Sequence, residues 1–232
     1  LFGDKDFTKA LRNTSIYVVF VVPCSIALSL LIAVLLNSNI KFRGLFQTIF
    51  FLPYVTSVIA IGLVWSWIFN SNYGLLNYVL SWFGIAKVQW LNKPKYALPS
   101  LIIFSVWKSM AFDILIFLAG LQTIPKDLYN AARVDSTPRW RVFWKITVPG
   151  IAPMISYAFI MGFISAFKVY NEVFSLWGGK AGPANSAITV VYYIYDKFYN
   201  SHNYGLASAA AVILFLIILV LTVVQRMMGK KK

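Results

Sequence analysis

Residue types that carry chemistry in most enzymes are scarce in this sequence. Among its 232 residues are one cysteine, Cys24, and one histidine, His202. A single cysteine excludes an intrachain disulfide and a cysteine metal cluster, and we expect His202 to be a solvated loop residue. No Ser/His/Asp set, cluster of metal ligands or GxxxxGK[ST] phosphate loop is present. The sequence therefore predicts no catalytic residue, no metal and no bound cofactor in this chain.

Acidic residues are also few, and the chain as a whole carries little charge. Seven Asp and Glu stand against 21 Lys and Arg, for a net charge of +14, yet only 12% of residues are charged and 59% are apolar. This composition excludes a soluble domain. The net charge alone could indicate nucleic-acid binding, but the basic residues cluster in short loops between apolar runs, as they do in membrane proteins. We expect a lipid membrane and no nucleic acid as partner.

Long apolar runs predict an all-α polytopic membrane protein. About twenty apolar residues are enough to cross the hydrocarbon core as a helix, and the sequence has about five such runs. We expect a transmembrane core over residues 15–225, with spans at about 15–36, 48–69, 98–121, 151–172 and 206–225. A polar lead-in helix is expected over residues 1–14, and a basic cytoplasmic tail over 226–232.

Local signals refine this topology. Pro23 predicts a tolerated kink in the first span, and Pro53 and Gly62 predict bends or close packing in the second. Residues 75–83 could form an interfacial helix. The loop charges favour a cytoplasmic C-terminus. The chain begins with Leu1 and shows no signal-peptide pattern, so we interpret it as a fragment.

One polar segment, residues 124–150, separates the third and fourth spans and carries five of the 21 basic residues. Pro125 is expected to begin a short helix through residues 130–132, and Thr137 and Pro138 are expected to be the N-cap and first residue of a second. Two short, cationic helices on the cytoplasmic side indicate a docking element. The alternative is an ordinary basic loop that obeys the positive-inside rule.

This segment resembles the signature loop of bacterial ABC-importer permeases, with its Glu-Ala-Ala, Asp-Gly-Ala, Trp, Phe, Ile and Leu-Pro positions. Three residues depart from that pattern: Asn130 for Glu, Ser136 for Gly and Val148 for Leu. Stretches such as LLNSNIKFRGLFQTIFFLPYV and WGGKAGPANSAITVVYYIYDKF resemble the carbohydrate-uptake branch of these permeases. The residues that match the signature loop are Ala131, Ala132, Asp135, Trp140, Phe143, Ile146 and Pro149.

The resemblance implies the permease subunit of a sugar or oligosaccharide importer in the bacterial inner membrane, working by alternating access. It also implies a second related permease, a dimer of ATPase subunits that bind ATP and Mg, and an extracytoplasmic solute-binding protein. Import of glycerol 3-phosphate or another polyol phosphate is the alternative. A gated channel is a more distant alternative, because channel function does not explain the spacing of the signature-loop residues. A membrane enzyme would need a nucleophile, a metal cluster or a pair of carboxylates.

The resemblance assigns the loop to coupling with the ATPase. Asn130 can donate or accept a hydrogen bond there but cannot form the ion pair of the usual Glu. We expect Arg133, Asp135 and Arg139 to supply most polar anchoring, while two alanines allow close approach. The full set of coupling candidates is Asn130, Ala131, Ala132, Arg133, Asp135, Ser136, Arg139 and Trp140.

Polar and aromatic residues in the third and fourth spans are candidates for the substrate path. Ionisable side chains within a span are energetically costly, so each of them is a candidate for a functional role. Lys108 and Asp113 are expected to point about 140° apart, whereas Lys168 and Glu172 are expected to share a helix face and pair. Lipid contact, helix packing and snorkelling are the alternatives. The candidates are Ser105, Lys108, Ser109, Phe112, Asp113, Ser165, Lys168, Tyr170, Asn171 and Glu172.

Overall fold

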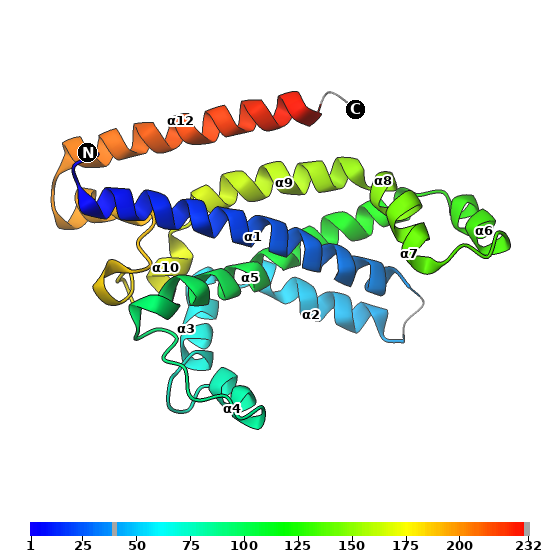
Figure 1. Ribbon diagram of the computed structural model, residues 1–232, viewed down its shortest axis with the longest axis horizontal. Coiled ribbons are helices and arrows are strands. Elements are labelled where there is room, and N and C mark those ends of the chain that lie inside the picture. Colours follow the sequence, from blue (N-terminus) through cyan, green and yellow to red (C-terminus); the bar gives the residue numbers. More distant parts are fainter. Residues whose placement is uncertain (39–40, 230–232) are drawn as a thin grey trace. The chain divides into compact units, whose positions relative to one another are not determined.

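The computed structural model describes residues 1–38 and 41–229, and regular structure in this part of the chain is helical, with no strand (Figure 1). The predicted all-α class is confirmed. The chain forms two compact units, each assembled from separated stretches. The first unit comprises residues 1–22, 56–107 and 163–232, and the second comprises residues 23–55 and 108–162.

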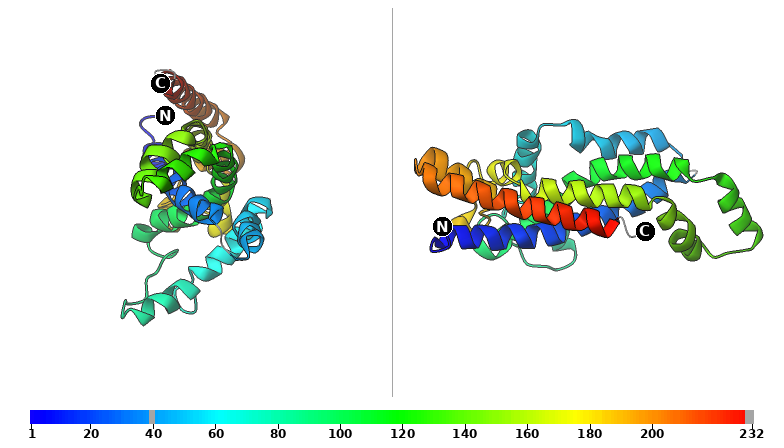
Figure 2. Two further views of the ribbon diagram at one scale, coloured as in Figure 1. Left: turned by 90° about the vertical axis from the view of Figure 1, so that its right-hand side faces the viewer. Right: turned by 90° about the horizontal axis from the view of Figure 1, so that it is seen from above.

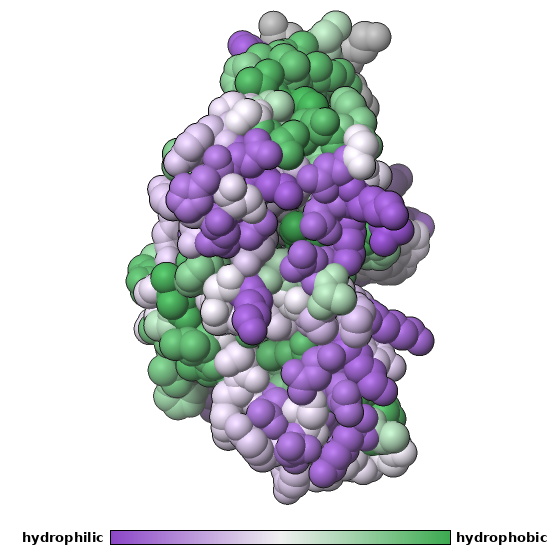
Figure 3. Space-filling model, turned by 90° about the vertical axis from the view of Figure 1, so that its left-hand side faces the viewer, coloured by the Kyte–Doolittle hydropathy of each residue, from purple (hydrophilic) through white to green (hydrophobic). Residues whose placement is uncertain are grey.

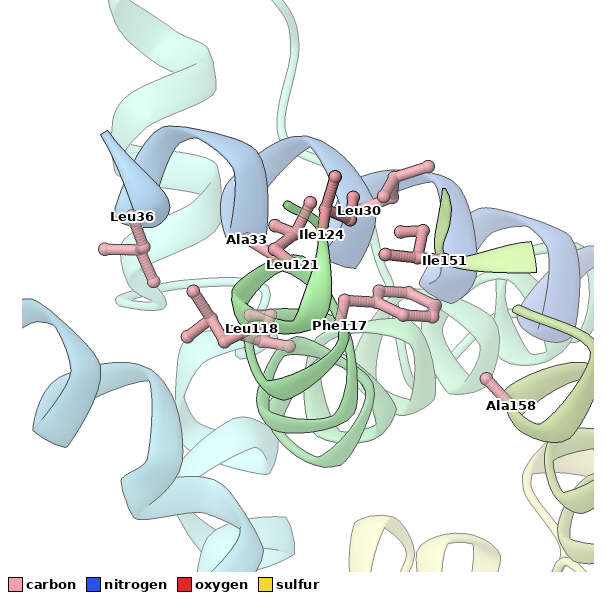
Figure 4. Packing of buried hydrophobic residues seen from close by; sticks show 10 residues of the cluster. Leu30, Ala33, Leu36, Phe117, Leu118, Leu121, Ile124, Ile151 and Ala158 are labelled. Carbon is pink, nitrogen blue, oxygen red and sulfur yellow. The ribbon is translucent and has the colours of Figure 1, made fainter. Parts of the chain in front are cut away.

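The second unit is built on an apolar core. It contains the later part of α1 (Lys5–Asn37), α2 (Arg43–Val55), the later part of α5 (Pro94–Thr123), α6 (Lys126–Val134), α7 (Arg139–Val142), the π-helix η1 (Phe143–Thr147), α8 (Val148–Gly150) and most of α9 (Ala152–Phe167). Leu30, Ala33 and Leu36 on α1 pack with α5 (Figure 4). Phe117 and Ile151 are fully buried in this cluster.

The first unit contains the beginning of α1 and α5, together with α3 (Val58–Ile68), α4 (Leu75–Trp82), α10 (Asn171–Leu176), the 3-10 helix η2 (Pro183–Asn185), α11 (Val190–Tyr195), the π-helix η3 (Asp196–Asn200) and α12 (Tyr204–Gly229). Polar side chains of α1 hold the segment before α11. The Asn13 amide donates to the carbonyls of Ser186 and Ile188, both at 3.0 Å, and Thr14 accepts from the Val190 amide at 3.0 Å. Figure 3 shows a face of the molecule on which hydrophilic residues gather in the middle and lower part, with hydrophobic residues above them and to their left.

The N-terminal end of α1 is tied to α11 and η3 by a charged cluster. Tyr193 donates a hydrogen bond to Asp4 at 2.9 Å, and the Lys197 ammonium lies 3.4 Å from the same carboxylate. Partial burial alone would raise the pKa of Asp4. The Tyr193 hydroxyl, the Asp6 amide and Lys197 stabilise the carboxylate, so the pKa of Asp4 is lowered overall. The start of the chain is therefore part of the packed first unit.

Three helices are long and apolar enough to cross a membrane, namely Lys5–Asn37, Pro94–Thr123 and Tyr204–Met227. Two further spans are available if each bent pair of helices counts as one. The pair α2 and α3 is bent by 106°, and the pair Arg139–Gly150 and Ala152–Phe167 by 68°. The expected number of about five spans corresponds to the upper count among the described residues.

Three expected boundaries are wrong. Residues 1–14 do not form a separate helix, because α1 runs without a break from Lys5 to Asn37. The run over 48–69 is broken, since Ser57 adopts an extended ψ of 129° before α3. The run over 151–172 ends early, at Phe167. There the carbonyl of Val169 accepts a hydrogen bond from the Thr189 hydroxyl at 2.9 Å, in place of a helical amide.

Gly62 allows α3 and α10 to pack closely, as its position in the sequence suggested. A Cβ atom at Gly62 would overlap the Ser175 Cβ and Oγ atoms, and Ser175 is buried on α10. Ser175 is itself fixed, because its hydroxyl donates to the Glu172 carbonyl at 3.1 Å. The contact therefore requires a glycine on one side.

We expect Gly62→Ala to destabilise the protein by about 1–3 kcal/mol, because the added methyl overpacks this contact. Adding Ser175→Gly should restore stability, since it removes both clashing atoms. Gly44→Ala on α2 is the control, because nothing lies within 4 Å of a Cβ there. Thermal stability in detergent, followed by size-exclusion chromatography, measures all three. Equal melting of Gly62→Ala and Gly44→Ala would contradict the packing argument.

Candidate functional site

The two short helices expected in residues 124–150 are present, at one end of the second unit (Figures 1 and 2). Pro125 is the N-cap of α6. The N-cap of α7 is Pro138 rather than Thr137, which corrects the predicted register. Pro138 has an extended ψ of 144°, and its carbonyl accepts from the amides of Arg141 at 2.9 Å and Val142 at 3.2 Å. Pro138 therefore precedes the helix instead of being its first residue.

The loop is closed on itself by contacts between its two ends. The Ile124 side chain packs against the bare backbone of Gly150, where a Cβ would lie only 2.7 Å from its Cδ1 atom. Further along, the hydroxyls of Tyr129 and Thr147 form a hydrogen bond of 3.2 Å. Tyr129 also packs against the core cluster of the second unit. These contacts fix α6 to the helices on both sides of the loop.

The helix α6 presents one face inward and leaves the other open. Ala132 is only 7% exposed, whereas Ala131 is exposed. The expectation that both alanines allow a partner to approach is therefore corrected, and only Ala131 is available for such contact. Two apolar residues that the sequence analysis did not single out, Leu128 and Val134, are 49% and 85% exposed. Their spacing of three residues on either side of Ala131 was the signal that could have identified an apolar stripe.

The polar coupling candidates lie on α6, at its C-cap and at the start of α7. Their side chains are exposed, and they combine one carboxylate with two guanidinium groups and an amide. A surface of mixed charge with an apolar centre suits contact with another protein. The residues are Asn130, Arg133, Asp135 and Arg139, and the exposed Trp140 follows on α7.

Ser136 ends α6 in a strained conformation. Its φ is +50°, in the left-handed region that favours glycine. The amides of Ser136 and Thr137 donate to the carbonyls of Arg133 at 3.2 Å and Ala132 at 2.9 Å, which is the Schellman pattern of helix termination. The position where the resemblance has glycine thus requires a left-handed residue, and serine occupies it at an energetic cost.

The substrate-path candidates divide between the two units. Ser105, Ser165, Lys168, Tyr170, Asn171 and Glu172 belong to the first unit, and Lys108, Ser109, Phe112 and Asp113 to the second. The expected shared helix face of Lys168 and Glu172 is wrong, because α9 ends at Phe167 and α10 begins at Asn171. The predicted divergence of Lys108 and Asp113 stays a prediction.

Within each unit, some candidates have defined surroundings. In the first, Ser105 and Tyr17 are both buried, and their hydroxyl groups lie close together. In the second unit, Asp113 and Ser25 are both buried, and the Ser25 hydroxyl lies within hydrogen-bonding reach of the Asp113 carboxyl. There, too, Phe112 stacks on Tyr54 with ring centroids 5.3 Å apart and an interplanar angle of 20°.

Tyr170 lies in an aromatic cluster with tyrosines of α11 and η3. Its ring centroid is 5.0 Å from that of Tyr195, which is 5.1 Å from that of Tyr199. Burial, followed by the neighbouring tyrosines, raises the pKa of Tyr170 to about 12. The hydroxyl of Tyr170 therefore stays neutral and can act as donor and acceptor at physiological pH.

Among residues 1–38 and 41–229, no three His, Cys, Asp or Glu side chains are grouped as a metal site requires. The absence of a metal and a cofactor stays a prediction for the whole chain.

The long apolar helices define a polytopic membrane protein in which the short helices of residues 124–150 separate two candidate spans. The chain belongs to the family described as "Binding-protein-dependent transport system inner membrane component", whose model matches residues 25–232. It is thus a multi-pass component of the inner membrane.

Named relatives cover nearly the whole chain. It is 36% identical over 222 residues to the arabinooligosaccharides transport system permease protein AraP of Halalkalibacterium halodurans, covering 94% of this chain and 70% of the relative. It is 36% identical over 203 residues to the trehalose/maltose transport system permease protein MalF of Thermococcus litoralis, and the match covers 88% of this chain and 68% of the relative. It is 33% identical over 231 residues to the lactose transport system permease protein LacF of Rhizobium radiobacter, and the match covers 97% of this chain and 76% of the relative.

A solved structure supports the same fold. A chain of a bacterial alginate ABC transporter, in complex with its alginate pentasaccharide-bound periplasmic protein, is similar with a TM-score of 0.88. The two chains are 26% identical, and the match covers 100% of this chain and 81% of the other. The resemblance to ABC-importer permeases is confirmed.

We expect Ser136→Gly to stabilise the end of α6 by about 0.5–1 kcal/mol, because relief of the left-handed strain exceeds the added entropy of the unfolded chain. Ser136→Val should have the opposite effect, since β-branched residues tolerate positive φ poorly. Hydrogen–deuterium exchange of the amides of residues 135–137 measures the change. Unchanged exchange in both variants would show that the strain does not affect local stability.

Proposed function

We propose that this chain is the permease subunit of an ATP-driven importer that moves a sugar or oligosaccharide into the cytoplasm by alternating access. The observation that supports this most strongly is 33–36% identity, over most of the chain, to permeases named for arabinooligosaccharides, trehalose/maltose and lactose. The proposed partners are a second related permease, two ATPase subunits and an extracytoplasmic solute-binding protein. ATP and Mg are bound by the ATPase partner.

The stripe of Leu128, Ala131 and Val134 on α6 is the proposed contact with the ATPase. Its exposed apolar side chains can enter a groove, and Arg133 and Asp135 can pair with charges at the rim. Asn130 contributes a hydrogen bond in place of the ion pair made by Glu in the usual pattern. Because Tyr129 and Ala132 hold α6 against its own unit, a displacement of α6 is transmitted to the helices that flank the loop.

The proposed substrate path uses polar and aromatic groups of α5, α9 and the segment after α9. Sugars are bound by hydrogen bonds to their hydroxyls and by aromatic rings against their apolar faces. In the first unit, Tyr170 and Asn171 offer both kinds of group, and Ser165 and Lys168 are exposed nearby in the sequence. In the second, Lys108, Ser109 and Phe112 are partly exposed.

The ATPase activity of the purified four-subunit complex in lipid, with and without the solute-binding protein, tests this function across a panel of sugars and glycerol phosphates. Stimulation by one sugar together with its binding protein supports the proposal and identifies the cargo. Stimulation by a glycerol phosphate alone would replace sugar with a polyol phosphate. Lack of stimulation by any panel member would contradict the carbohydrate assignment.

We expect Ala131→Trp to lower sugar-stimulated ATPase activity at least about tenfold, because the bulky ring prevents α6 from approaching the ATPase; a loss of about 1.4 kcal/mol in coupling suffices for this. Ala86→Trp is the matched control, because Ala86 is an exposed alanine outside the loop. Both variants should retain the thermal stability of the parent permease. Full stimulated activity in Ala131→Trp would exclude this face of α6 as the contact.

A further inference from the structure

The segment that follows α6 differs from it in charge. No acidic residue occurs between Ser136 and Gly150, whereas Arg139, Arg141 and Lys145 all lie there and are exposed. In contrast, α6 and its C-cap carry Asp127 and Asp135 beside their basic residues. A purely cationic surface suits an anionic partner rather than a protein groove of mixed charge.

Two tryptophans on this cationic segment are open to their surroundings. Trp140 is 65% exposed and Trp144 is 63% exposed, and they lie one helical turn apart. The Arg141 guanidinium carbon lies 5.6 Å from the centroid of the Trp140 ring. The opposite side of the same segment is occupied, since Phe143 and Ile146 pack against the core cluster and Thr147 is buried. The outward-facing indoles therefore have no place in the core of their unit.

The segment is also continuous with a membrane span. Together, residues 139–150 and α9 are long and apolar enough to form one membrane span, although the two parts are bent by 68°. A bend of this size allows the later helix to cross the bilayer while the earlier one lies near its surface. Tryptophan is enriched at this depth, where its ring is amphipathic, and basic residues next to a span are attracted to anionic lipids of the cytoplasmic leaflet.

We propose that residues 139–147 form a membrane-surface anchor that binds anionic phospholipid headgroups of the cytoplasmic leaflet. Trp140 and Trp144 insert their rings at headgroup depth, and Arg141 and Lys145 pair with lipid phosphates. Trp140, which the sequence analysis assigned to the ATPase contact, thereby belongs to the lipid contact. The anchor holds one end of the loop at the bilayer while α6 engages the ATPase.

The test uses the complete complex in nanodiscs that contain equal mole fractions of dibrominated phosphatidylglycerol or dibrominated phosphatidylcholine. Subtracting the tryptophan emission of Trp140→Phe/Trp144→Phe from that of the parent isolates these two residues. We expect this difference emission to be quenched at least twofold more strongly by the brominated phosphatidylglycerol, since each basic residue favours anionic lipid by about fivefold. Arg141→Gln/Lys145→Gln should bring the ratio of the two quenching effects close to one.

Lys93→Gln/Lys95→Gln is the matched control, because it removes two exposed basic residues elsewhere in the chain and should leave the ratio unchanged. Equal quenching by both lipids in the parent, or no quenching, overturns the proposal. If the tryptophan variant does not assemble, photoactivatable phosphatidylglycerol is applied to the unmodified complex. Lipid adducts within residues 139–147 then support the anchor, and lipid adducts confined to other segments of the complex, or no adducts, overturn it. Neither result bears on Ala131, whose effect is measured by stimulated ATPase activity.

Discussion

The contact of Ile124 with the bare backbone of Gly150 is the constraint on which the arrangement of the loop depends. It brings the two ends of a segment of more than twenty residues together, so that α6 and α7 extend from a closed base. A Cβ atom at residue 150 would lie 2.7 Å from Ile124 Cδ1 and 2.9 Å from Ile124 Cγ1, so a larger residue there would require Ile124 to move. The buried Ile151 next to it continues the contact into the core of the second unit. A rigid base is what allows force on a short helix to move longer ones instead of deforming the loop.

Contacts of Ala132 and Tyr129 give α6 a fixed orientation on that base. Ala132 is turned inward, while the hydrogen bond between Tyr129 and Thr147 prevents rotation of the helix about its axis. The three outward residues of the apolar stripe are consequently presented together. The Schellman termination at Ser136 then turns the chain sharply into α7. Orientation is thus determined by packing within the loop and does not depend on a bound partner.

The sequence was sufficient to predict the parts of this structure that depend on local pattern. The apolar runs, the prolines at 125 and 138 and the signature spacing indicate helical spans and two short helices between them. A bend or close packing was predicted at Pro53, but the break after Val55 that separates α2 from α3 was not, and the polar residues after Phe167 were not recognised as the end of α9. Those boundaries depend on distant groups, such as Thr189, which lies twenty residues beyond the Val169 carbonyl that it satisfies. The inward direction of Ala132 likewise depends on tertiary packing, and two adjacent alanines look identical in sequence.

The departures from the signature pattern are physically compatible with its role when the whole loop is considered. Serine at 136 can adopt the left-handed conformation that glycine adopts more easily, so the turn is kept while local stability falls. Asparagine at 130 loses a charge, but α6 retains acidic and basic groups close to its apolar stripe. Since exposed ion pairs contribute little each, the apolar centre of a contact usually matters more than one rim charge. The geometry of α6, rather than the identity of residue 130, is therefore the feature that the proposed coupling role requires.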